Sequence, residues 1–129
     1  MKKLTRQQTK THNTRLVLKT LYQRQQLSRA DLSRQTRLTR PTVSSLVSDL
    51  MADDLVLEVG TAPSGGGKPP TLLAINHDGH HLLALDLGST VLRGALVNLR
   101  GDILVRRERP LTIATGTPSG DDVLQLVYD

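Results

Sequence analysis

A short run of hydroxyl and cationic side chains between residues 39 and 45 could form hydrogen bonds with a polyanion. The run contains Thr39, Arg40, Thr42, Ser44 and Ser45. An arginine guanidinium can bond the O6 and N7 atoms of a guanine or clamp a phosphate, and serine and threonine hydroxyls suit bases or phosphates. These residue types therefore predict contact with DNA, provided that the local structure turns them outward.

A second group, Asp86, Gly88, Ser89 and Thr90, could bind a phosphate group. A glycine-containing turn exposes backbone N–H groups, and a neighbouring hydroxyl can also donate a hydrogen bond to a phosphate. A tight turn needs glycine for steric reasons alone, however. The motif therefore has a purely structural interpretation as well, and we predict no cofactor.

The helix expected to present the first group begins after Thr39, which can cap it, and carries Pro41 in its first turn. Five apolar residues have the spacing of one narrow helical stripe: Val43, Leu46, Val47, Leu50 and Met51. The opposite face carries Thr42, Ser45, Ser48 and Asp49. Small hydroxyl residues are mediocre helix formers. A face built from them favours a helix that presses closely against a partner.

Two helices are expected before this one. Residues 1–12 are polar and basic and predict a flexible arm, after which Asn13 caps a helix that ends near Arg24. Its apolar stripe consists of Val17, Leu18, Leu21 and Tyr22. Ser28 caps a second, shorter helix that ends near Gln35, and a three-residue turn leads from there to the third helix.

A hairpin with a glycine-rich tip follows the third helix. The outgoing strand is predicted to be buried on one side by Leu55, Leu57 and Val59. The return strand runs from Thr71 to Ile75, and the tip offers Gly66 and Lys68 for a close approach to DNA. Three helices and such a hairpin are typical of a winged helix-turn-helix. A module of this shape can also bind only protein.

The charge distribution favours DNA over protein as the partner. Residues 1–54 contain eleven Lys and Arg against four Asp, a local net charge of +7, whereas residues 55–129 contain six basic and eight acidic residues, a net of −2. Such asymmetry indicates that the N-terminal part faces a polyanion. Arg29 and Arg34, on the second helix, are expected near the DNA backbone.

The composition excludes several other classes of protein and site. Without cysteine there is no disulfide framework and no thiolate metal site. His77, His80 and His81 lie in and after a turn with no evident fourth ligand, so we predict no metal site. No apolar run resembles a signal peptide or approaches the roughly 20 residues that span a bilayer. We therefore expect a cytoplasmic protein that does not contact a membrane.

The second half of the chain changes to strands, and we place the domain boundary at the turn that ends at Gly79. Residues 1–79 then form the DNA-binding domain, and residues 80–129 begin another. Three strands are predicted, at residues 82–86, 91–98 and 103–109. A loop over residues 110–120 and a helix that opens at Asp121 follow. So few elements bury too little to stand alone.

Several segments resemble one known family. Leu27–Leu32, Leu38–Ser44 and Leu46–Leu50 look like the DNA-binding domain of the ROK family of sugar-responsive transcriptional regulators, which are related to bacterial sugar kinases. Gly67–Leu73 is similar to the family's glycine-basic-Pro-Pro wing. Leu85–Thr90 resembles the first phosphate-binding hairpin of its actin-like ATPase fold.

This resemblance implies an α+β chain: a winged helix-turn-helix followed by a truncated actin-like ATPase domain that opens with three β-strands. In the related kinases, the residue matched by Asp86 helps to hold hydrated Mg²⁺. Ser89 stands where those enzymes usually have a second glycine. The family's catalytic aspartate, sugar-contacting residues and zinc motif would all lie beyond Asp129, so a sugar effector is expected only with that part present.

The sequence thus predicts a sequence-specific regulator, a repressor of sugar-utilisation genes, rather than an enzyme. Its partner would be a double-stranded operator with two-fold symmetry, bound by a homodimer of the full-length protein. Two alternatives stay open: a fragment of a ROK-type sugar kinase and a winged-helix module that binds protein. The DNA-binding helices argue against the kinase, because kinases of this family begin directly at the Asp86-type hairpin.

Overall fold

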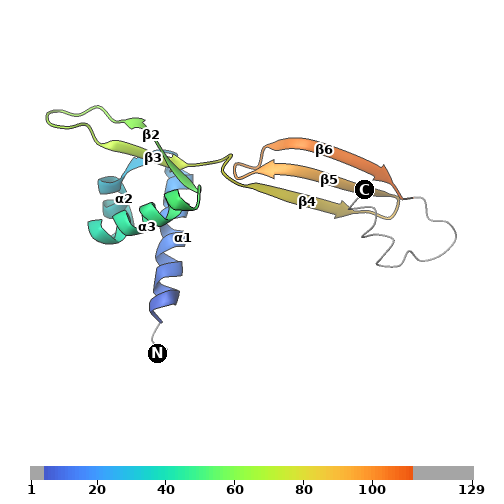
Figure 1. Cartoon of the computed structure of the whole chain (residues 1–129), viewed down its shortest axis with the longest axis horizontal. Helices are drawn as coiled ribbons and strands as arrows, with labels where there is room; N and C mark the ends of the chain where they lie inside the picture. The colour runs from blue at the N-terminus through green and yellow to red at the C-terminus, as the bar shows by residue number, and fades with distance from the viewer. Residues whose placement is uncertain (1–4, 112–129) are drawn as a thin grey trace. The chain divides into compact units, whose positions relative to one another are not determined.

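The structure, a computed structural model, describes residues 5–111 of the chain (Figure 1). It divides into two compact units, Met1–His80 and His81–Asp129. The first contains, in chain order, α1 (Arg6–Arg24), β1 (Leu27–Ser28), α2 (Arg29–Thr36), α3 (Arg40–Ala52), β2 (Val56–Thr61) and β3 (Thr71–Ile75). The second contains β4 (His81–Leu87), β5 (Val91–Asn98) and β6 (Ile103–Pro110). A loop was expected over residues 110–120, but Pro110 still belongs to β6. The part of that loop beyond residue 111 and the helix expected at Asp121 lie outside the described residues.

The first helix begins earlier than its sequence indicated. We expected a flexible arm up to residue 12 and a cap at Asn13, and this was wrong. The Thr5 hydroxyl accepts a hydrogen bond from the Gln8 backbone N–H (3.2 Å), and Gln8 Oε1 accepts one from the Thr5 N–H (2.9 Å). This capping box satisfies two N–H groups at once. The helix therefore starts at Arg6, about two turns earlier than expected.

The caps predicted for the next two helices are confirmed. The Ser28 hydroxyl accepts from the Asp31 N–H (3.1 Å) at the start of α2, and the Thr39 hydroxyl accepts from the Thr42 N–H (3.4 Å) at the start of α3. Between the two helices, Arg37 adopts a left-handed conformation (φ 59°), which ends α2 and turns the chain.

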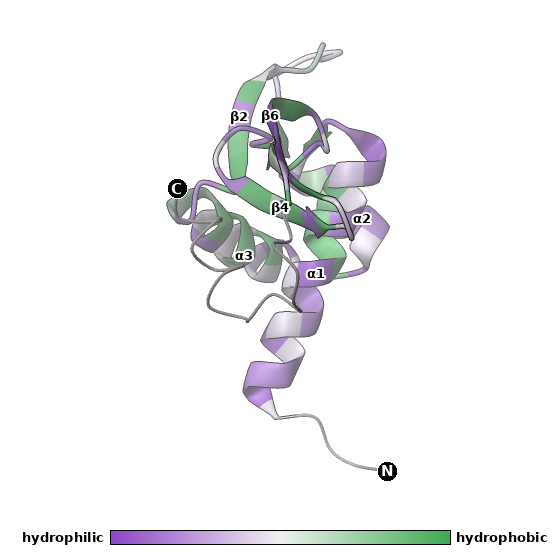
Figure 2. Ribbon diagram, turned by 90° about the vertical axis from the view of Figure 1, so that its right-hand side faces the viewer, coloured by the Kyte–Doolittle hydropathy of each residue, from purple (hydrophilic) through white to green (hydrophobic). Residues whose placement is uncertain are grey.

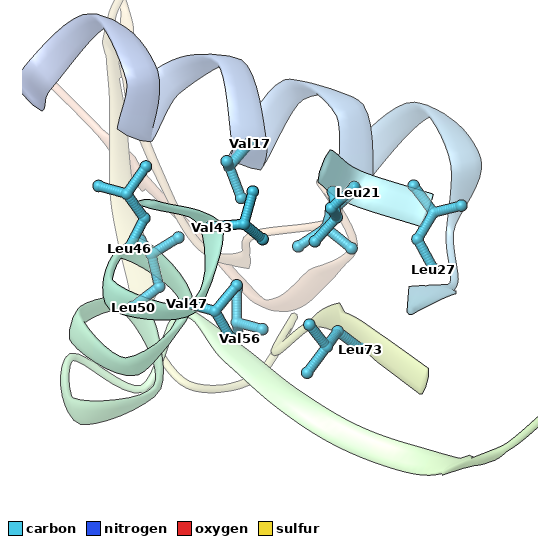
Figure 3. Packing of buried hydrophobic residues seen from close by; sticks show 10 residues of the cluster. Val17, Leu21, Leu27, Val43, Leu46, Val47, Leu50, Val56 and Leu73 are labelled. Atoms are coloured by element: carbon cyan, nitrogen blue, oxygen red, sulfur yellow. The ribbon is translucent and has the colours of Figure 1, made fainter. Parts of the chain in front are cut away.

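Ten hydrophobic side chains form the core of the first unit (Figure 3). They come from every element of the unit: Val17, Leu21, Leu27, Leu32, Val43, Leu46, Val47, Leu50, Val56 and Leu73. Figure 3 shows Val17 pointing from α1 toward Val43 of α3. Four of the five residues predicted for the α3 stripe are therefore buried, and Met51 is partly buried. Tyr22, predicted for the stripe of α1, is instead 56% exposed.

The hairpin pairs as predicted, but its first strand faces the other way. The sheet order is β1-β3-β2, with Val56 opposite Ile75 and Thr61 opposite Thr71, and a bulge at Glu58–Gly60. Val56 is the buried residue of β2, whereas Val59 is 40% exposed. The alternation predicted from Leu57 and Val59 was therefore wrong, whereas Leu55, which precedes β2, is partly buried and packs against the core. Only the start of β2 lies over the helices, because the strand then continues into the wing.

A close turn ends the first unit. The Gly79 N–H donates to the Asn76 carbonyl (3.2 Å), and His80 Nε2 lies 2.6 Å from the Asp53 carbonyl oxygen. A Cβ atom on Gly79 would lie only 2.0 Å from the Asp54 carbonyl oxygen. Only glycine therefore lets this turn pack against the end of α3.

The second unit is a three-stranded antiparallel sheet in the order β4-β5-β6, which confirms the three predicted strands. Side chains at paired positions share a face of the sheet. One face therefore gathers Leu83, Leu85, Leu87, Leu92, Leu96 and Val105. Of the hydrophobic residues described in this unit, only Leu92 is buried. None of the described helices is long and apolar enough to cross a membrane.

Candidate nucleic-acid interface

The outward face of α3 carries small polar side chains. Ser44, Ser45 and Ser48 are exposed, and Thr42 is half-buried. Figure 2 shows hydrophobic and hydrophilic residues alternating along the α3 ribbon. Four core residues on the opposite side fix the orientation of the helix: Val43, Leu46, Val47 and Leu50. The core therefore determines that the serine face points to solvent.

Arg40 is the first residue of α3, and its side chain is available for a ligand. It is exposed and has no ion-pair or hydrogen-bond partner among residues 5–111. Thr39 and Thr42 are engaged with each other, since their hydroxyl oxygens lie 2.8 Å apart. Thr39 therefore acts first as a cap. Thr42 keeps part of its hydrogen-bonding capacity for a ligand.

Arg29 and Arg34, both expected near DNA, already have carboxylate partners. Arg29 Nη1 lies 3.3 Å from Glu58 Oε1, a contact that connects α2 to the base of the wing. Arg34 forms an ion pair with Asp31, one turn earlier on α2. Exposed pairs of this kind stabilise a protein by only about 0.2–1 kcal/mol. Each arginine could exchange its carboxylate for a phosphate, but each is locally neutralised without DNA.

The wing tip owes its shape to two glycines. Gly66 and Gly67 have φ values of 149° and 85°, in the region that side chains disfavour, and a Cβ on either would meet nothing within 4 Å. Backbone conformation, and not crowding, therefore explains both. Ser64 donates to the Gly67 carbonyl (3.2 Å) across the turn. Lys68 is exposed and has no ion-pair partner in the described part of the chain.

The sequence analysis did not identify two further cationic side chains near α3. Arg37 is exposed in the turn between α2 and α3. The sequence predicted this turn but no contact between Arg37 and DNA. Lys10 Nζ lies 2.7 Å from Asp49 Oδ2 of α3, because α1 extends back to Arg6. The capping-box signature formed by Thr5 and Gln8 was the available signal for that extension.

The hairpin that resembles a phosphate site does not fit a magnesium-phosphate group as it stands. Arg93 Nη1 lies 3.4 Å from Asp86 Oδ2. The carboxylate that would approach a magnesium ion therefore already pairs with a guanidinium. The Gly88 N–H donates to the Val91 carbonyl (2.9 Å), and a Cβ on Gly88 would lie 3.0 Å from that oxygen. The Gly88 N–H is thus used to close the turn, and the close approach of the Val91 oxygen explains why a glycine occupies this position. Ser89 and Thr90 are exposed.

No group of three His, Cys, Asp or Glu side chains with the geometry of a metal site occurs within residues 5–111. His77 and Tyr22 form an edge-to-face ring contact with centroids 6.4 Å apart. His80 bonds to the backbone end of α3. The structure thus brings these histidines into packing and backbone contacts.

Comparison with known proteins identifies the fold family of this interface. Residues 10–56 match the winged helix-turn-helix DNA-binding family. The chain is 32% identical over 116 residues to the xylose repressor of Bacillus subtilis (strain 168) and 31% identical over 117 residues to that of Caldicellulosiruptor bescii. It also matches the crystal structure of a ROK family transcriptional regulator, a homologue of the E. coli MLC protein, with a TM-score of 0.73 and 26% identity. Over nearly its whole length the chain is thus similar to ROK family regulators.

The aligned part is 90% of this chain for the Bacillus subtilis repressor, 91% for that of Caldicellulosiruptor bescii and 92% for the solved structure. The chain spans only about 30% of the length of these relatives. The predicted family and the α+β fold that begins with a winged helix-turn-helix are thereby confirmed. The individual DNA contacts, the domain boundary at Gly79 and any role of Asp86 stay predictions.

Proposed function

We propose that this chain is the DNA-binding part of a sequence-specific repressor of sugar-utilisation genes. One observation carries the proposal: α3 presents a small hydroxyl face with an unpaired Arg40 at its start, while its other face is fixed in the core. The matched relatives named xylose repressors support the sugar connection. A sugar effector would then bind in the part of the relatives' length, about 70%, that this chain does not span.

In the proposed complex, the first turns of α3 enter the major groove. Arg40 bonds the O6 and N7 atoms of a guanine, and Thr42, Ser44 and Ser45 contact bases or neighbouring phosphates. Lys68 on the wing contacts the backbone or the minor groove. A homodimer of the full-length protein would place two α3 helices about 34–36 Å apart on a two-fold operator. Such a protein acts in the cytoplasm and is not an enzyme.

The first experiment separates DNA binding from protein binding. The 129-residue chain is titrated with random-sequence duplex DNA at several salt concentrations. Released counterions should make log K fall steeply and linearly with log salt, with a slope of about −0.9 for each phosphate contacted. No binding, or binding insensitive to salt, would contradict the proposal and favour a module that binds protein.

The second experiment tests base reading by Arg40. A preferred site is selected from a pool of randomised duplexes, and Arg40→Ala is compared with wild type on that site and on random DNA. Loss of a bidentate base contact should cost about 1–3 kcal/mol on the selected site and much less on random DNA. Arg15→Ala, which removes an exposed arginine from α1, is the control. Equal losses on both DNAs would make Arg40 a phosphate contact instead.

The third experiment tests the kinase alternative. Calorimetry of the chain with Mg-ATP should show no binding tighter than about 1 mM, because Arg93 already pairs with Asp86 and the Gly88 N–H closes the turn. Turnover of a hexose that Asp86→Asn abolishes would contradict a non-enzymatic role.

A further inference from the structure

The first two turns of α1 stand out because they bury no side chain. Every residue from Thr5 to His12 is exposed. A short helical segment without packing is marginal in water. The contacts that hold this one are the Thr5–Gln8 capping box and the ion pair between Lys10 and Asp49 of α3. A segment that contributes nothing to the core has its role at the surface.

An open groove lies between this end of α1 and the beginning of α3. It is lined by Arg6, Lys10 and Asn13 from α1 and by Pro41, Thr42 and Ser45 from α3. The three α1 residues recur at i, i+4 and i+7, so they share one face of the helix. The groove therefore sets two cations directly beside the α3 residues that we propose contact DNA.

The charges of the groove favour an anion. Lys10 Nζ lies 2.7 Å from Asp49 Oδ2, so its positive charge offsets the negative charge of this carboxylate on the exposed face of α3. Arg6 has no ion-pair partner among residues 5–111, and the first turn of α1 contains no acidic residue. The groove thus keeps an uncompensated positive charge at Arg6. The Lys10 ammonium has three donors, so it can bond a second oxygen besides that of Asp49.

We infer that this groove binds the phosphate backbone of one DNA strand, next to the major groove that α3 enters. Arg6 donates to one phosphate, and Lys10 is shared between Asp49 and a neighbouring phosphate. These contacts carry no sequence information but fix the register of α3 on the duplex. The inference rests on the proposed function and adds a second point of attachment outside the helix-turn-helix and the wing.

The sequence offers two matched controls. Arg15 and Lys19 follow Arg6 and Lys10 by nine residues each, which places them on the opposite side of the same helix, about 180° away. Both are exposed. Arg15→Ala and Lys19→Ala therefore remove the same charges from the same helix without touching the groove.

The four alanine variants are titrated with random-sequence duplex DNA at several salt concentrations, and circular dichroism verifies their helix content. Arg6→Ala and Lys10→Ala should each reduce the salt slope by about 0.9, the value of one lost phosphate contact. Arg15→Ala and Lys19→Ala should keep the wild-type slope. Equal slopes for all five proteins, or equal reductions in all four variants, would overturn the groove contact.

Asp49→Asn provides a second readout when it is made both in wild type and in the Lys10→Ala background. Loss of any surface carboxylate reduces repulsion of DNA, so only the part of the gain that disappears without Lys10 reports the shared contact. Removing this carboxylate leaves Lys10 free for phosphate, so binding to random DNA should tighten several-fold, whereas Lys10→Ala weakens it. Asp53→Asn, at the far end of α3, is the control and should change binding much less. Weaker binding by Asp49→Asn would overturn the shared role of Lys10.

The two proposals fail in different ways. If wild type shows no salt-dependent DNA binding, the proposed function and the groove contact are both contradicted. If wild type binds steeply but Arg6→Ala and Lys10→Ala behave like their controls, only the groove contact falls.

Discussion

The two units of the chain are built from similar aliphatic residues but bury them very differently. In the first, ten hydrophobic side chains from three helices and three strands close into one core. In the second, the described sheet buries Leu92 alone among its hydrophobic residues, while Leu83, Leu85 and Leu87 of β4 are all more than half exposed. The first unit therefore has the closed core that an independently stable domain requires. A three-stranded sheet with an apolar face needs a second layer to cover it.

This difference bears on function because the recognition helix takes its orientation from the closed core. Val43, Leu46, Val47 and Leu50 anchor α3 on one side, so its polar face has a defined direction before any ligand arrives. Preorganisation of this kind lowers the entropic cost of binding. The hairpin at Asp86–Thr90 has no comparable support, because β4 is exposed along its whole length.

The largest expected effect compares one leucine from each unit. Leu46→Ala removes a 4% exposed core residue and should lower the free energy of unfolding by about 2–5 kcal/mol. Leu85→Ala makes the same change at a 51% exposed site and should lie within about 0.5 kcal/mol of wild type. Urea unfolding, followed by circular dichroism in the helical and the β-sheet regions of the spectrum, measures both. Equal effects would mean that the two units are stabilised together.

A smaller effect is expected where the first unit ends. Gly79→Ala would place a Cβ 2.0 Å from the Asp54 carbonyl, so the turn must move off the end of α3. Backbone displacement of this kind should cost about 1–3 kcal/mol. Gly65→Ala in the wing tip, where a Cβ meets nothing within 4 Å, is the control and should be nearly neutral. An unchanged melting temperature for Gly79→Ala would show that this turn is not packed as described.

The helix caps should give a still smaller, graded effect. Ser28→Ala leaves the first turn of α2 uncapped in the closed unit and should cost about 1 kcal/mol. Thr5→Ala removes the cap of helical turns that bury nothing, so it should reduce helix content while changing the free energy of unfolding less. Thermal unfolding and the helical signal of the folded protein separate the two. A larger loss from Thr5→Ala would contradict this order.

Local signals in the sequence predicted the elements that pack locally. The stripe from Val43 to Met51, the caps at Ser28 and Thr39, and the return strand from Thr71 to Ile75 each depend on residues a few positions apart. The start of α1 was missed because polar turns show no apolar periodicity, and the Lys10–Asp49 pair that helps to hold them joins residues far apart in sequence.

The remaining errors also concern tertiary geometry. The burial of Val56 depends on where β2 leaves the helices, and the alternation of residue types does not reveal that. In the candidate interface, the exposure of Arg40 could be predicted from its place at the start of a capped helix. The pairing of Arg29 with Glu58 could not, because it depends on how the wing meets α2.

The smallest expected effect is a pH dependence at the start of α2. The Ser28 hydroxyl donates to Asp31 Oδ2 (2.7 Å) and, with the Arg34 guanidinium, holds the pKa of the Asp31 carboxyl below its ordinary value of 3.8. A carboxyl whose pKa is lower in the folded protein adds stability above its unfolded pKa and loses it as the pH falls through the folded value. Because the side chain of Asp31 is 33% exposed, Asp31→Asn should cost no more than about 1 kcal/mol at pH 7.

The difference in unfolding free energy between wild type and Asp31→Asn should therefore stay constant from about pH 7 to 5 and shrink below about pH 4. Ser28→Ala provides the matched control. Without the hydroxyl donor, the pKa of Asp31 should move back toward 3.8, so in that background the Asp31→Asn difference is smaller at pH 7. Urea unfolding of wild type, Asp31→Asn, Ser28→Ala and the double variant across this pH range measures both effects. A difference between wild type and Asp31→Asn that persists unchanged at pH 2 would show that Asp31 stabilises α2 through packing and not through its charge.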